Sequence, residues 1–194
     1  MNVEKVCVYC ASSSQIAEKY FIAAQELGRL LAENSIDLVY GGGARGTMGS
    51  LADAALAAGG TVIGVMPKFM VDLEWAHPEI HELMITDTMH ERKAKMIEDV
   101  DAVVALPAGS GTLEELVETL TMKRLGLFLK PIILVNLDGF YNSLIEQYQR
   151  FIDEHFMDSR HTALWSVVQQ PNQVLDAIAS AQEWYSDARK FAAI

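Results

Sequence analysis

The chain has 194 residues, 51% of them hydrophobic, and a formal net charge of −11 at pH 7. Its length suits one globular domain with a substantial apolar core, and two cysteines are too few for a disulfide framework. The acidic charge argues against a nucleic-acid scaffold, and no stretch reaches the ~18 apolar residues of a membrane helix. We therefore expect a single globular domain over residues 1–194, located in the cytoplasm, without nucleic-acid or membrane partners.

Apolar runs typical of buried strands alternate with helical segments along the whole chain. The expected strands cover residues 3–9, 36–40, 61–66, 80–85, 102–106, 131–136 and 163–168. The expected helices cover residues 16–33, 47–58, 88–98, 113–125, 139–155 and 172–185, with serines at 12–14 capping the first and a loop at 67–79. This alternation predicts a Rossmann-like, doubly wound α/β fold, in which a mainly parallel sheet carries helices on both faces.

Two glycine-rich turns each follow an expected strand and each open an expected helix. The first turn is G-G-G-A-R-G-T-M-G at 41–49, and the second is P-A-G-S-G-T-L-E-E at 107–115. A glycine turn at a helix N-terminus leaves backbone N–H groups unpaired, and the helix dipole adds partial positive charge there. We therefore expect both turns to bind phosphate at the carboxyl ends of the strands, and a phosphorylated small molecule as the ligand.

The second turn has the more specific composition. Gly109 and Gly111 permit positive φ and close approach of a ligand, while Ser110 and Thr112 add hydroxyl donors. These four residues are the expected phosphate cradle.

Acidic residues crowd the start of the helix that follows this turn. Glu114, Glu115 and Glu118 would each gain ~0.3–1 kcal/mol from the helix dipole even if they only faced water. On a helical wheel Glu115 lies opposite Leu113 and Leu120, which are expected to face the core. The residue pattern by itself therefore favours a solvated Glu115, with a functional role as the alternative.

A cationic helix is expected between the two turns. Arg92 and Lys95 share one of its faces, whereas Met89, Lys93 and Met96 share another. Such a run is usually a solvated face, but in an acidic protein it would also supply the local positive charge that an anionic ligand requires.

Other interpretations of these motifs remain open from the residues alone. The first turn also fits the G-x-G-x-x-G pattern of dinucleotide binding, but Pro67-Lys68 stands where an NAD site would need a carboxylate. Lys68 leaves an NADP site as an alternative.

Cys7 and Cys10 form C-x-x-C within and just after a strand, so we interpret them as ordinary thiols. Several apolar residues would either pack in the core or line an apolar ligand pocket, namely Met48, Met66, Met89 and Trp75.

Three segments, taken in order, resemble the LOG ("lonely guy") family of phosphoribohydrolases, many of which were once labelled lysine decarboxylases. The family pattern is G-G-G-x-x-G-x-M-G, then M-H-x-R-K-A, then P-G-G-x-G-T-x-x-E, and this chain matches at 41–49, 89–94 and 107–115. The likeness spans roughly residues 3–168. Two departures are Thr47 in place of a frequent Leu, and Ala108 in place of Gly, which is expected to reshape the turn slightly if positive φ is needed there.

The resemblance implies an enzyme that hydrolyses the N-glycosidic bond of a purine nucleoside 5′-monophosphate. The substrate would be AMP or an N6-substituted cytokinin nucleotide, and the products a free base and ribose 5-phosphate. No metal or organic cofactor is implied, and the expected assembly is a homodimer with the site near the subunit interface.

Carried over by position, the resemblance makes Arg92 and Glu115 the catalytic pair. It implies substrate contacts at Glu74, Lys93, Gly109, Ser110, Gly111, Thr112, Leu113, Glu114 and Thr121. Further candidate contacts to phosphate or nucleotide are Ser13, Gly42 and Gly43.

The main alternative is a non-catalytic protein that binds or carries a nucleotide or a phosphorylated cofactor. A carrier does not need a carboxylate beside its phosphate site, so the presence of both Arg92 and Glu115 favours the enzyme. A true lysine decarboxylase is disfavoured, because that reaction ordinarily uses pyridoxal phosphate on a lysine and no lysine stands out here.

Overall fold

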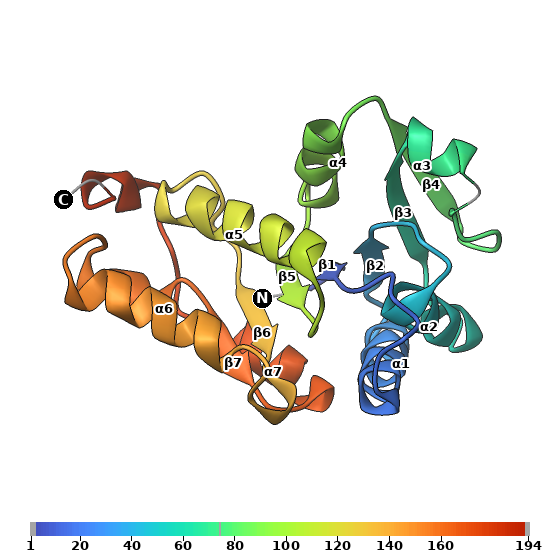
Figure 1. Cartoon of the computed structure of the whole chain (residues 1–194), viewed down its shortest axis with the longest axis horizontal. Coiled ribbons are helices and arrows are strands. Elements are labelled where there is room, and N and C mark those ends of the chain that lie inside the picture. The colour runs from blue at the N-terminus through green and yellow to red at the C-terminus, as the bar shows by residue number, and fades with distance from the viewer. Residues whose placement is uncertain (1–2, 74, 193–194) are drawn as a thin grey trace.

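The computed structural model describes residues 3–73 and 75–192. Within these ranges, parallel strands form one seven-stranded sheet in the order β4-β3-β2-β1-β5-β6-β7 (Figure 1). The strands are β1 (Lys5–Tyr9), β2 (Asp37–Tyr40), β3 (Val62–Pro67), β4 (Glu82–Thr86), β5 (Ala102–Ala105), β6 (Ile132–Val135) and β7 (Ser166–Val168). The chain moves outward from β1 to β4, returns to the centre at β5 and moves outward again, so the predicted doubly wound fold is confirmed.

Helices connect the strands on both sides of the sheet (Figure 1). They are α1 (Glu18–Glu33), α2 (Gly46–Ala57), α3 (Lys68–Asp72), α4 (Met89–Met96), α5 (Ser110–Arg124), α6 (Asn142–Asp153) and α7 (Val174–Ala179). Short 3₁₀ helices lie at Leu137–Gly139, Ser159–Ala163, Pro171–Gln173 and Ser186–Lys190. Among the described residues, none of the helices combines the length and the apolar character needed to cross a bilayer.

The apolar core forms two layers, one on each face of the sheet. Successive strand residues point to opposite faces, so Val6 and Val8 pack with α1, α2 and α7, whereas Cys7 and Tyr9 pack with α4, α5 and α6. Burial on both faces explains why the central strands are continuous apolar runs rather than alternating ones.

The sheet order brings the two glycine-rich turns close together. Strand β1 lies between β2 and β5, and the turns follow β2 and β5 directly. The connections after β1 and β2 lead to one face of the sheet, while the connection after β5 leads to the other. This divergence leaves a crevice at the carboxyl ends of the strands, which is where ligands bind in such folds.

Several element boundaries differ from the predicted ones. Helix α1 begins at Glu18 with Ala17 as its N-cap and no side-chain cap, so the prediction that the serines at 12–14 cap it is wrong. Helix α3 lies inside the segment predicted as a loop. Helix α6 begins at Asn142 rather than 139, because Asp138 and Gly139 have positive φ of 51° and 75° and form a turn.

The predicted closing helix at 172–185 is mostly wrong. Only Val174–Ala179 is α-helical, preceded by a 3₁₀ turn that Pro171 opens. At the helix end the Ser180 hydroxyl donates to the Asp176 carbonyl, and beyond it the Trp184 indole N–H donates to the carbonyl of Lys123 on α5. The chain therefore leaves the helix to cover the α5 side of the core.

Cys7 and Cys10 are free, buried thiols that belong to opposite core layers. Burial raises the pKa of both. These features agree with ordinary core thiols and not with a reactive C-x-x-C pair.

Candidate functional site

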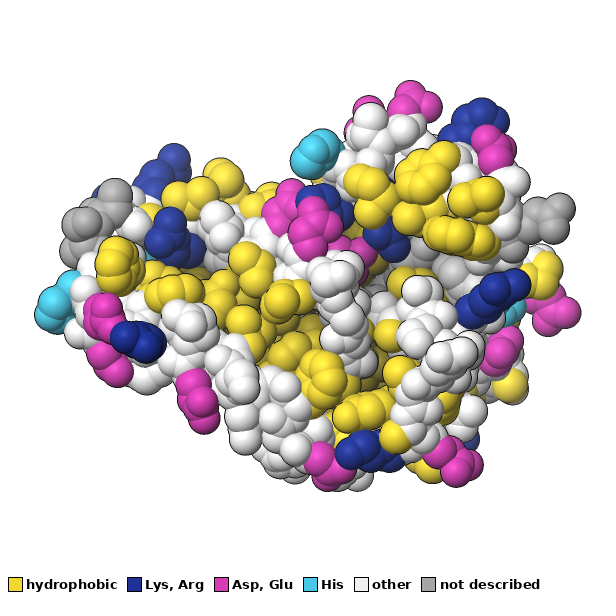
Figure 2. Space-filling model, viewed as in Figure 1, with side chains coloured by type: hydrophobic (Ala, Val, Ile, Leu, Met, Phe, Trp, Pro, Cys, Tyr) yellow, Lys and Arg dark blue, Asp and Glu magenta, His cyan; other side chains and the backbone are white. Residues whose placement is uncertain are grey.

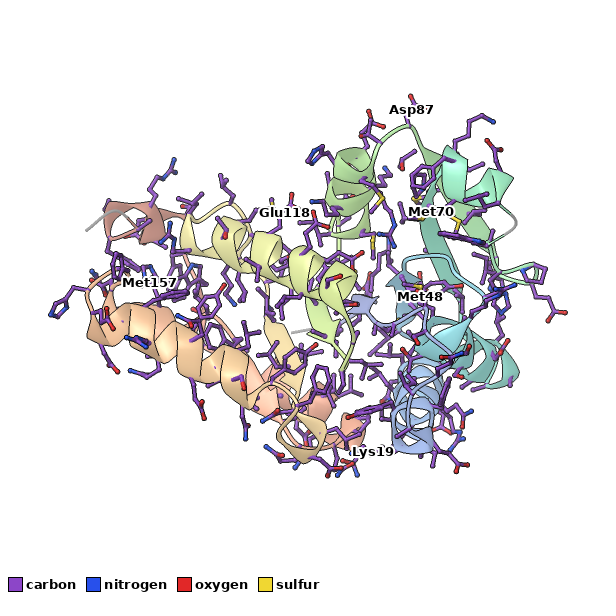
Figure 3. All side chains as sticks on the ribbon, in the orientation of Figure 1. Lys19, Met48, Met70, Asp87, Glu118 and Met157 are labelled. Carbon is purple, nitrogen blue, oxygen red and sulfur yellow. The ribbon has the colours of Figure 1, made fainter. Side chains whose placement is uncertain are left out.

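A cavity of about 510 Å³ opens at the carboxyl ends of the central strands. Its walls come from the loop after β1, the first glycine turn, the end of β3, the α3 segment, α4 and the second glycine turn. In Figure 3 the labelled Met48 and Met70 lie on α2 and α3, which bound the cavity opposite α5. The lining residues are Cys10, Ala11, Ser12, Ser13, Gly41, Gly43, Ala44, Arg45, Met48, Met66, Met70, Trp75, Met89, Arg92, Gly109, Ser110, Gly111, Thr112 and Glu115.

The second turn presents open backbone amides to this cavity. Helix α5 has Gly109 as its N-cap without a side-chain cap, and the first amide with a backbone partner is that of Leu113, at 3.1 Å from the Gly109 carbonyl. A Cβ built on Gly109 or Gly111 would meet nothing within 4 Å. Unpaired amides at the start of a 15-residue helix, with open space before them, form a favourable site for an anion.

The glycines of this turn do not serve the conformational role that we expected. Gly109 has a φ of −86°, and neither Gly111 nor Ala108 has positive φ. The freedom for positive φ that these glycines permit is therefore not used here, and Ala108 needs no reshaping of the turn. The absence of side chains matters because it leaves room in front of the amides.

The hydroxyl of Thr112 also differs from the expectation. It donates to the Cys10 carbonyl at 3.0 Å in a buried position, so it holds α5 against the end of β1. Thr112 therefore lines the cavity without offering this hydroxyl to a ligand, while Ser110 is exposed and also lines the cavity.

The first turn is packed more tightly by the protein itself. The Met48 amide donates to the Ala11 carbonyl at 3.0 Å, and the Thr47 hydroxyl accepts from the Ala11 amide at 2.8 Å. Gly46 has a φ of +64°, and a Cβ there would lie 2.5 Å from the same carbonyl. This turn therefore packs α2 against the loop after β1, and the open amides lie chiefly at the second turn.

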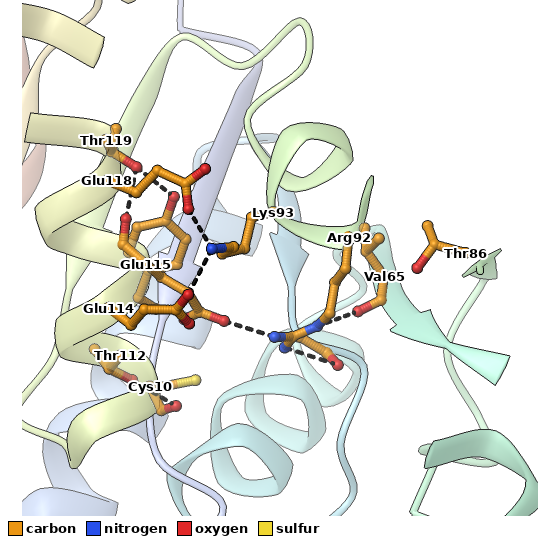
Figure 4. Close-up of polar contacts among 12 residues, drawn as sticks. Cys10, Val65, Thr86, Arg92, Lys93, Thr112, Glu114, Glu115, Glu118 and Thr119 are labelled. Atoms are coloured by element: carbon orange, nitrogen blue, oxygen red, sulfur yellow. Dashed lines mark hydrogen bonds and ion pairs between the residues drawn. The ribbon is translucent and has the colours of Figure 1, made fainter. Parts of the chain in front are cut away.

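A buried ion pair between Arg92 and Glu115 forms one wall of the cavity (Figure 4). Arg92 Nη1 donates to Glu115 Oε1 at 2.7 Å, Nε donates to the Val65 carbonyl at 3.0 Å, and Nη2 donates to the Gly41 carbonyl at 3.5 Å. A Cβ on Gly41 would lie 2.2 Å from Nη2, so glycine is needed there to admit the guanidinium. The pair joins α4 and α5 to the ends of β2 and β3.

Burial controls the chemistry of Glu115. Its side chain is 5% exposed, and burial raises the pKa of its carboxyl group while the Arg92 guanidinium opposes that rise. The helical-wheel expectation of a solvated Glu115 is wrong. Leu113, which was expected to face the core, is instead 43% exposed, and Val117 is only partly buried.

The charged side chains of α4, the cationic helix, lie on different faces from those predicted from the sequence. Lys93 is buried and contacts Glu114 Oε1 at 2.5 Å as well as the Glu118 carboxylate (Figure 4). Lys95 is exposed and pairs with Glu98 on its own side of the helix, so it does not share the environment of Arg92.

The structure brings together part of the expected substrate set. Besides the four residues of the second turn, Ser13 and Gly43 line the cavity. Gly42 does not: it has a φ of +80°, and its carbonyl accepts the His77 amide at 2.9 Å. Glu74 lies outside the described residues.

Other expected contacts lie away from the cavity. Leu113 and Glu114 are exposed and do not line the cavity, and the Glu114 carboxylate is paired with Lys93 of α4. Thr121 lines a separate groove between α5 and α6, and its hydroxyl donates to the Val117 carbonyl within the helix.

An apolar wall faces the open amides across the cavity. It consists of Met48, Met66, Met70, Trp75 and Met89, so the four side chains named from the sequence line the cavity, and Met66 is also buried in the core. Met70 was not anticipated, because it lies in the segment predicted as a loop. Arg45, an exposed residue of the first turn, also lines the cavity and was not singled out from the sequence.

Fold and site together define a Rossmann-like protein with open helix amides beside a buried carboxylate. A protein-family model described as "Possible lysine decarboxylase" matches residues 48–178. Cytokinin riboside 5′-monophosphate phosphoribohydrolase LOG2 of Arabidopsis thaliana is 44% identical over 168 residues, or 87% of this chain and 78% of that protein. Probable cytokinin riboside 5′-monophosphate phosphoribohydrolase LOGL6 of Oryza sativa subsp. japonica is 39% identical over 174 residues. These residues are 90% of this chain and 70% of that protein.

The chain therefore belongs to the LOG family, whose family model keeps the older lysine decarboxylase description. The family resemblance predicted from three motifs is confirmed.

Solved structures at lower identity share the fold. The molybdenum cofactor carrier protein MCP from Chlamydomonas reinhardtii aligns with a TM-score of 0.71 at 21% identity, covering 93% of this chain and 98% of that one. The molybdenum cofactor binding protein from Rippkaea orientalis aligns with a TM-score of 0.70 at 23% identity and the same coverage. At these identities the likeness shows the fold alone.

Proposed function

We propose that this protein is a phosphoribohydrolase that cleaves the N-glycosidic bond of a purine nucleoside 5′-monophosphate. Water adds to C1′ of the ribose, the bond from C1′ to the base nitrogen breaks, and the base leaves with a proton as ribose 5-phosphate forms. The observation that carries the proposal is one cavity holding both the open amides of α5 and the buried Arg92–Glu115 pair. Identities of 39–44% to the named phosphoribohydrolases support the same reaction.

The phosphate group is proposed to bind the amides of Ser110, Gly111 and Thr112. The N-terminal end of a helix favours an anion through both its N–H groups and its dipole, which offsets the acidic charge of the whole chain. Binding of the phosphate there fixes the ribose relative to Glu115, one helical turn further along α5, and such positioning lowers the barrier considerably.

Glu115 is proposed as the catalytic carboxylate. Glycosidic cleavage develops positive charge on the ribose ring, which a nearby carboxylate stabilises more in the transition state than in the neutral ground state. The same carboxylate orients the attacking water and accepts its proton, a role that burial supports by raising its pKa. Arg92 is proposed to hold the Glu115 carboxylate in place through its hydrogen bond from Nη1, since a guanidinium is not suited to act as a base.

The base is proposed to lie against the apolar wall of Met48, Met66, Met70, Trp75 and Met89. Thioether and indole side chains suit the flat faces of a purine, and they also accommodate an apolar N6 substituent. Both AMP and an N6-substituted cytokinin nucleotide are therefore candidate substrates.

A second copy of the chain is proposed to cover the groove between α5 and α6. Figure 2 shows hydrophobic side chains gathered in the hollow between these helices, and Phe156 there is 70% exposed. Apolar surface of this kind marks an interface in a protein that would otherwise expose it to water. Thr121 lines this groove, so it would lie at the interface of a homodimer, and the family resemblance implies a site near that interface.

A carrier of a phosphorylated cofactor is the second candidate, because the structural neighbours named above are a molybdenum cofactor carrier protein and a molybdenum cofactor binding protein. The buried ion pair favours the enzyme. A pyridoxal-phosphate decarboxylase is disfavoured, since the described cavity lining includes no lysine.

The test is incubation of the protein with AMP, with its N6-prenylated analogue and with adenosine, followed by measurement of free base and ribose 5-phosphate. We expect base release from the monophosphates and at least tenfold slower release from adenosine, roughly the effect of losing one charge-assisted contact. Glu115→Gln is expected to lose most turnover while still binding nucleotide. Near-normal turnover in that variant would refute the role of Glu115, and nucleotide binding without any base release by the unmodified protein would favour the carrier.

A further inference from the structure

A second, smaller cavity lies at the opposite end of α5 from the open amides. It has a volume of about 150 Å³ and lies where the end of α5 meets the starts of β6 and β7 and the segment that follows α7. Its polar lining side chains are Lys123, Ser166 and Gln182, and none of the described residues that line it is acidic. Most of the length of α5, on the order of 20 Å, separates it from the larger cavity.

Lys123 brings a positive charge without a counter-charge to this cavity. The residue is 2% exposed, its Nζ lies 5.9 Å from the centre of the Trp184 ring, and no ion pair within the described ranges includes it. Burial alone lowers the pKa of this amine to about 8, so it is still mainly protonated at pH 7. A buried charge is costly unless it is paired, so an anion beside Nζ would offset much of that cost.

The end of α5 does not pair with this charge. The last carbonyls of a helix carry partial negative charge, which ordinarily attracts a cation. Here the carbonyls of Thr121, Met122 and Lys123 each accept an N–H group from beyond the helix. An ammonium group has three N–H donors, and the Lys130 carbonyl accepts one of them at 2.9 Å. Two donors of Nζ are therefore left for a ligand.

Two neutral donors line the same cavity. In the part of the chain that the structure describes, neither the Ser166 hydroxyl nor the Gln182 side-chain amide makes a hydrogen bond within the protein. Ser166 begins β7 and is half-buried, whereas Gln182 is exposed on the segment that follows α7. A hydroxyl, a primary amide and an ammonium group around one space form a donor set that suits an anion.

We propose that this cavity binds a small monovalent anion, such as chloride or formate, held by Lys123, Ser166 and Gln182. One cation and two neutral donors match a single negative charge. The cavity is many times larger than the ~10–15 Å³ that one water requires, so a small anion fits. The anion joins α5 and β7 to the segment after α7, which runs up to the end of α5 in Figure 1 and already contacts it through Trp184.

The test is urea unfolding at pH 7 and constant ionic strength, with chloride or formate exchanged for a bulky organic sulfonate. We expect a saturable gain in stability, because the anion binds the folded chain and not the unfolded one. At a free anion concentration ten times the dissociation constant, the equilibrium constant for unfolding is expected to fall about elevenfold. Broadening of the chloride NMR signal, reversed by formate, measures the binding directly.

Gln182→Glu is the main test variant, because it is nearly isosteric and places a fixed carboxylate at the cavity. We expect it to lose the dependence on anions and to be more stable than the original protein when small anions are scarce. Gln25→Glu, at an exposed position of α1, is the matched control for the added charge and is expected to keep the dependence. Lys123→Met is expected to lose both the dependence and the chloride broadening.

The outcomes decide the proposal without any measurement of base release, so it stands or falls independently of the proposed function. A dependence that persists in Lys123→Met is a general salt effect and overturns it. If that variant does not fold, the same result in Gln182→Glu overturns it. Bicarbonate is the third probe, and a response to bicarbonate alone also overturns the proposal. That result would mean that carbon dioxide bonds to the neutral Lys123 Nζ, which loses a proton as the carbamate forms.

Discussion

Individual glycines in the site have two different physical roles. Gly41 makes room for a side chain of the protein, because a Cβ there would overlap the Arg92 guanidinium at 2.2 Å. Gly109 and Gly111 face open space in the cavity and leave the helix amides accessible. Both kinds of glycine belong to similar turns in the sequence, and only the structure separates them.

Gly111→Ala is expected to separate binding from stability. Gly111 lies in the first turn of α5 without positive φ, so alanine there is expected to keep or raise stability by up to ~0.5–1 kcal/mol. The added methyl group occupies the space in front of the amides, so the affinity for AMP and for ribose 5-phosphate is expected to fall at least tenfold. A tenfold loss corresponds to about 1.4 kcal/mol of binding free energy. Thermal unfolding and titration calorimetry measure the two effects.

Gly41→Ala is the comparison variant, and it is expected to lose both stability and activity because it displaces Arg92. If Gly111→Ala binds both ligands normally, the phosphate does not bind at this turn.

Lys123 is a buried cation whose removal is expected to stabilise the protein. It is 2% exposed, donates to the Lys130 carbonyl at 2.9 Å, and burial lowers its pKa from 10.5 to about 8. The unfolded chain therefore binds this proton more tightly, so stability is lowest below pH 8 and rises as the pH increases from about 8 to 10.5.

Lys123→Met is expected to raise the free energy of unfolding at pH 7 by ~1–3 kcal/mol and to flatten its rise above pH 8. Denaturant unfolding between pH 7 and 10.5 checks this, with the exposed Lys95→Met as control. Destabilisation of Lys123→Met across this whole range would mean that the hydrogen bond to Lys130 outweighs the burial of charge.

At the scale of elements, the short helix α4 depends on its cap. The Thr88 side chain accepts the Glu91 amide at 3.1 Å, and the Glu91 carboxylate accepts the Thr88 amide at 3.3 Å. An eight-residue helix is marginal without such support, and this one carries both Arg92 and Lys93. The cap therefore fixes the start of the element that positions the ion pair.

Thr88→Ala is expected to cost about 1 kcal/mol of stability and to lower kcat as well. Asp158→Ala removes a comparable cap, on the 3₁₀ helix Ser159–Ala163 away from the cavity, and is expected to lose stability with kcat retained. Chemical denaturation and steady-state kinetics on both variants test the comparison. Equal loss of kcat in the two would show that α4 has no special role.

The order of strands and helices followed from apolar periodicity, because a sheet covered on both faces leaves a strong local pattern. Helix α3 was missed because it buries none of its residues, so no apolar stripe marks it. The end of the chain was misassigned because residues 180–185 leave the helix for a tertiary contact between Trp184 and Lys123. Contacts of this kind are not encoded in a local pattern.

At the scale of the whole molecule, the site could be predicted in outline but not in detail. The motifs located the open amides of the second turn and identified the family, but they did not show that the first turn packs α2 against the loop after β1. The burial of Glu115 could not be read from a helical wheel, since its partner Arg92 comes from another helix. The outward position of Thr121 likewise depends on how α5 and α6 pack.

The proposed dimer gives a prediction at the same scale. Phe156→Asp is expected to leave the monomer folded, because this side chain is 70% exposed, and to weaken association through the groove between α5 and α6. Sedimentation velocity on both proteins measures the change, and the exposed Ile22→Asp on α1 is the control. An unmodified protein that sediments as a monomer at all concentrations would contradict the dimer.

The Arg92–Glu115 pair also links the two halves of the sheet. Arg92 is held by the ends of β2 and β3 on one side of β1, whereas Glu115 belongs to the helix that follows β5 on the other side. A nascent chain that has not yet added β5 and α5 contains a guanidinium with no carboxylate to receive it. Any chemistry that requires this pair is therefore absent until synthesis has passed the middle of the chain and both halves have met.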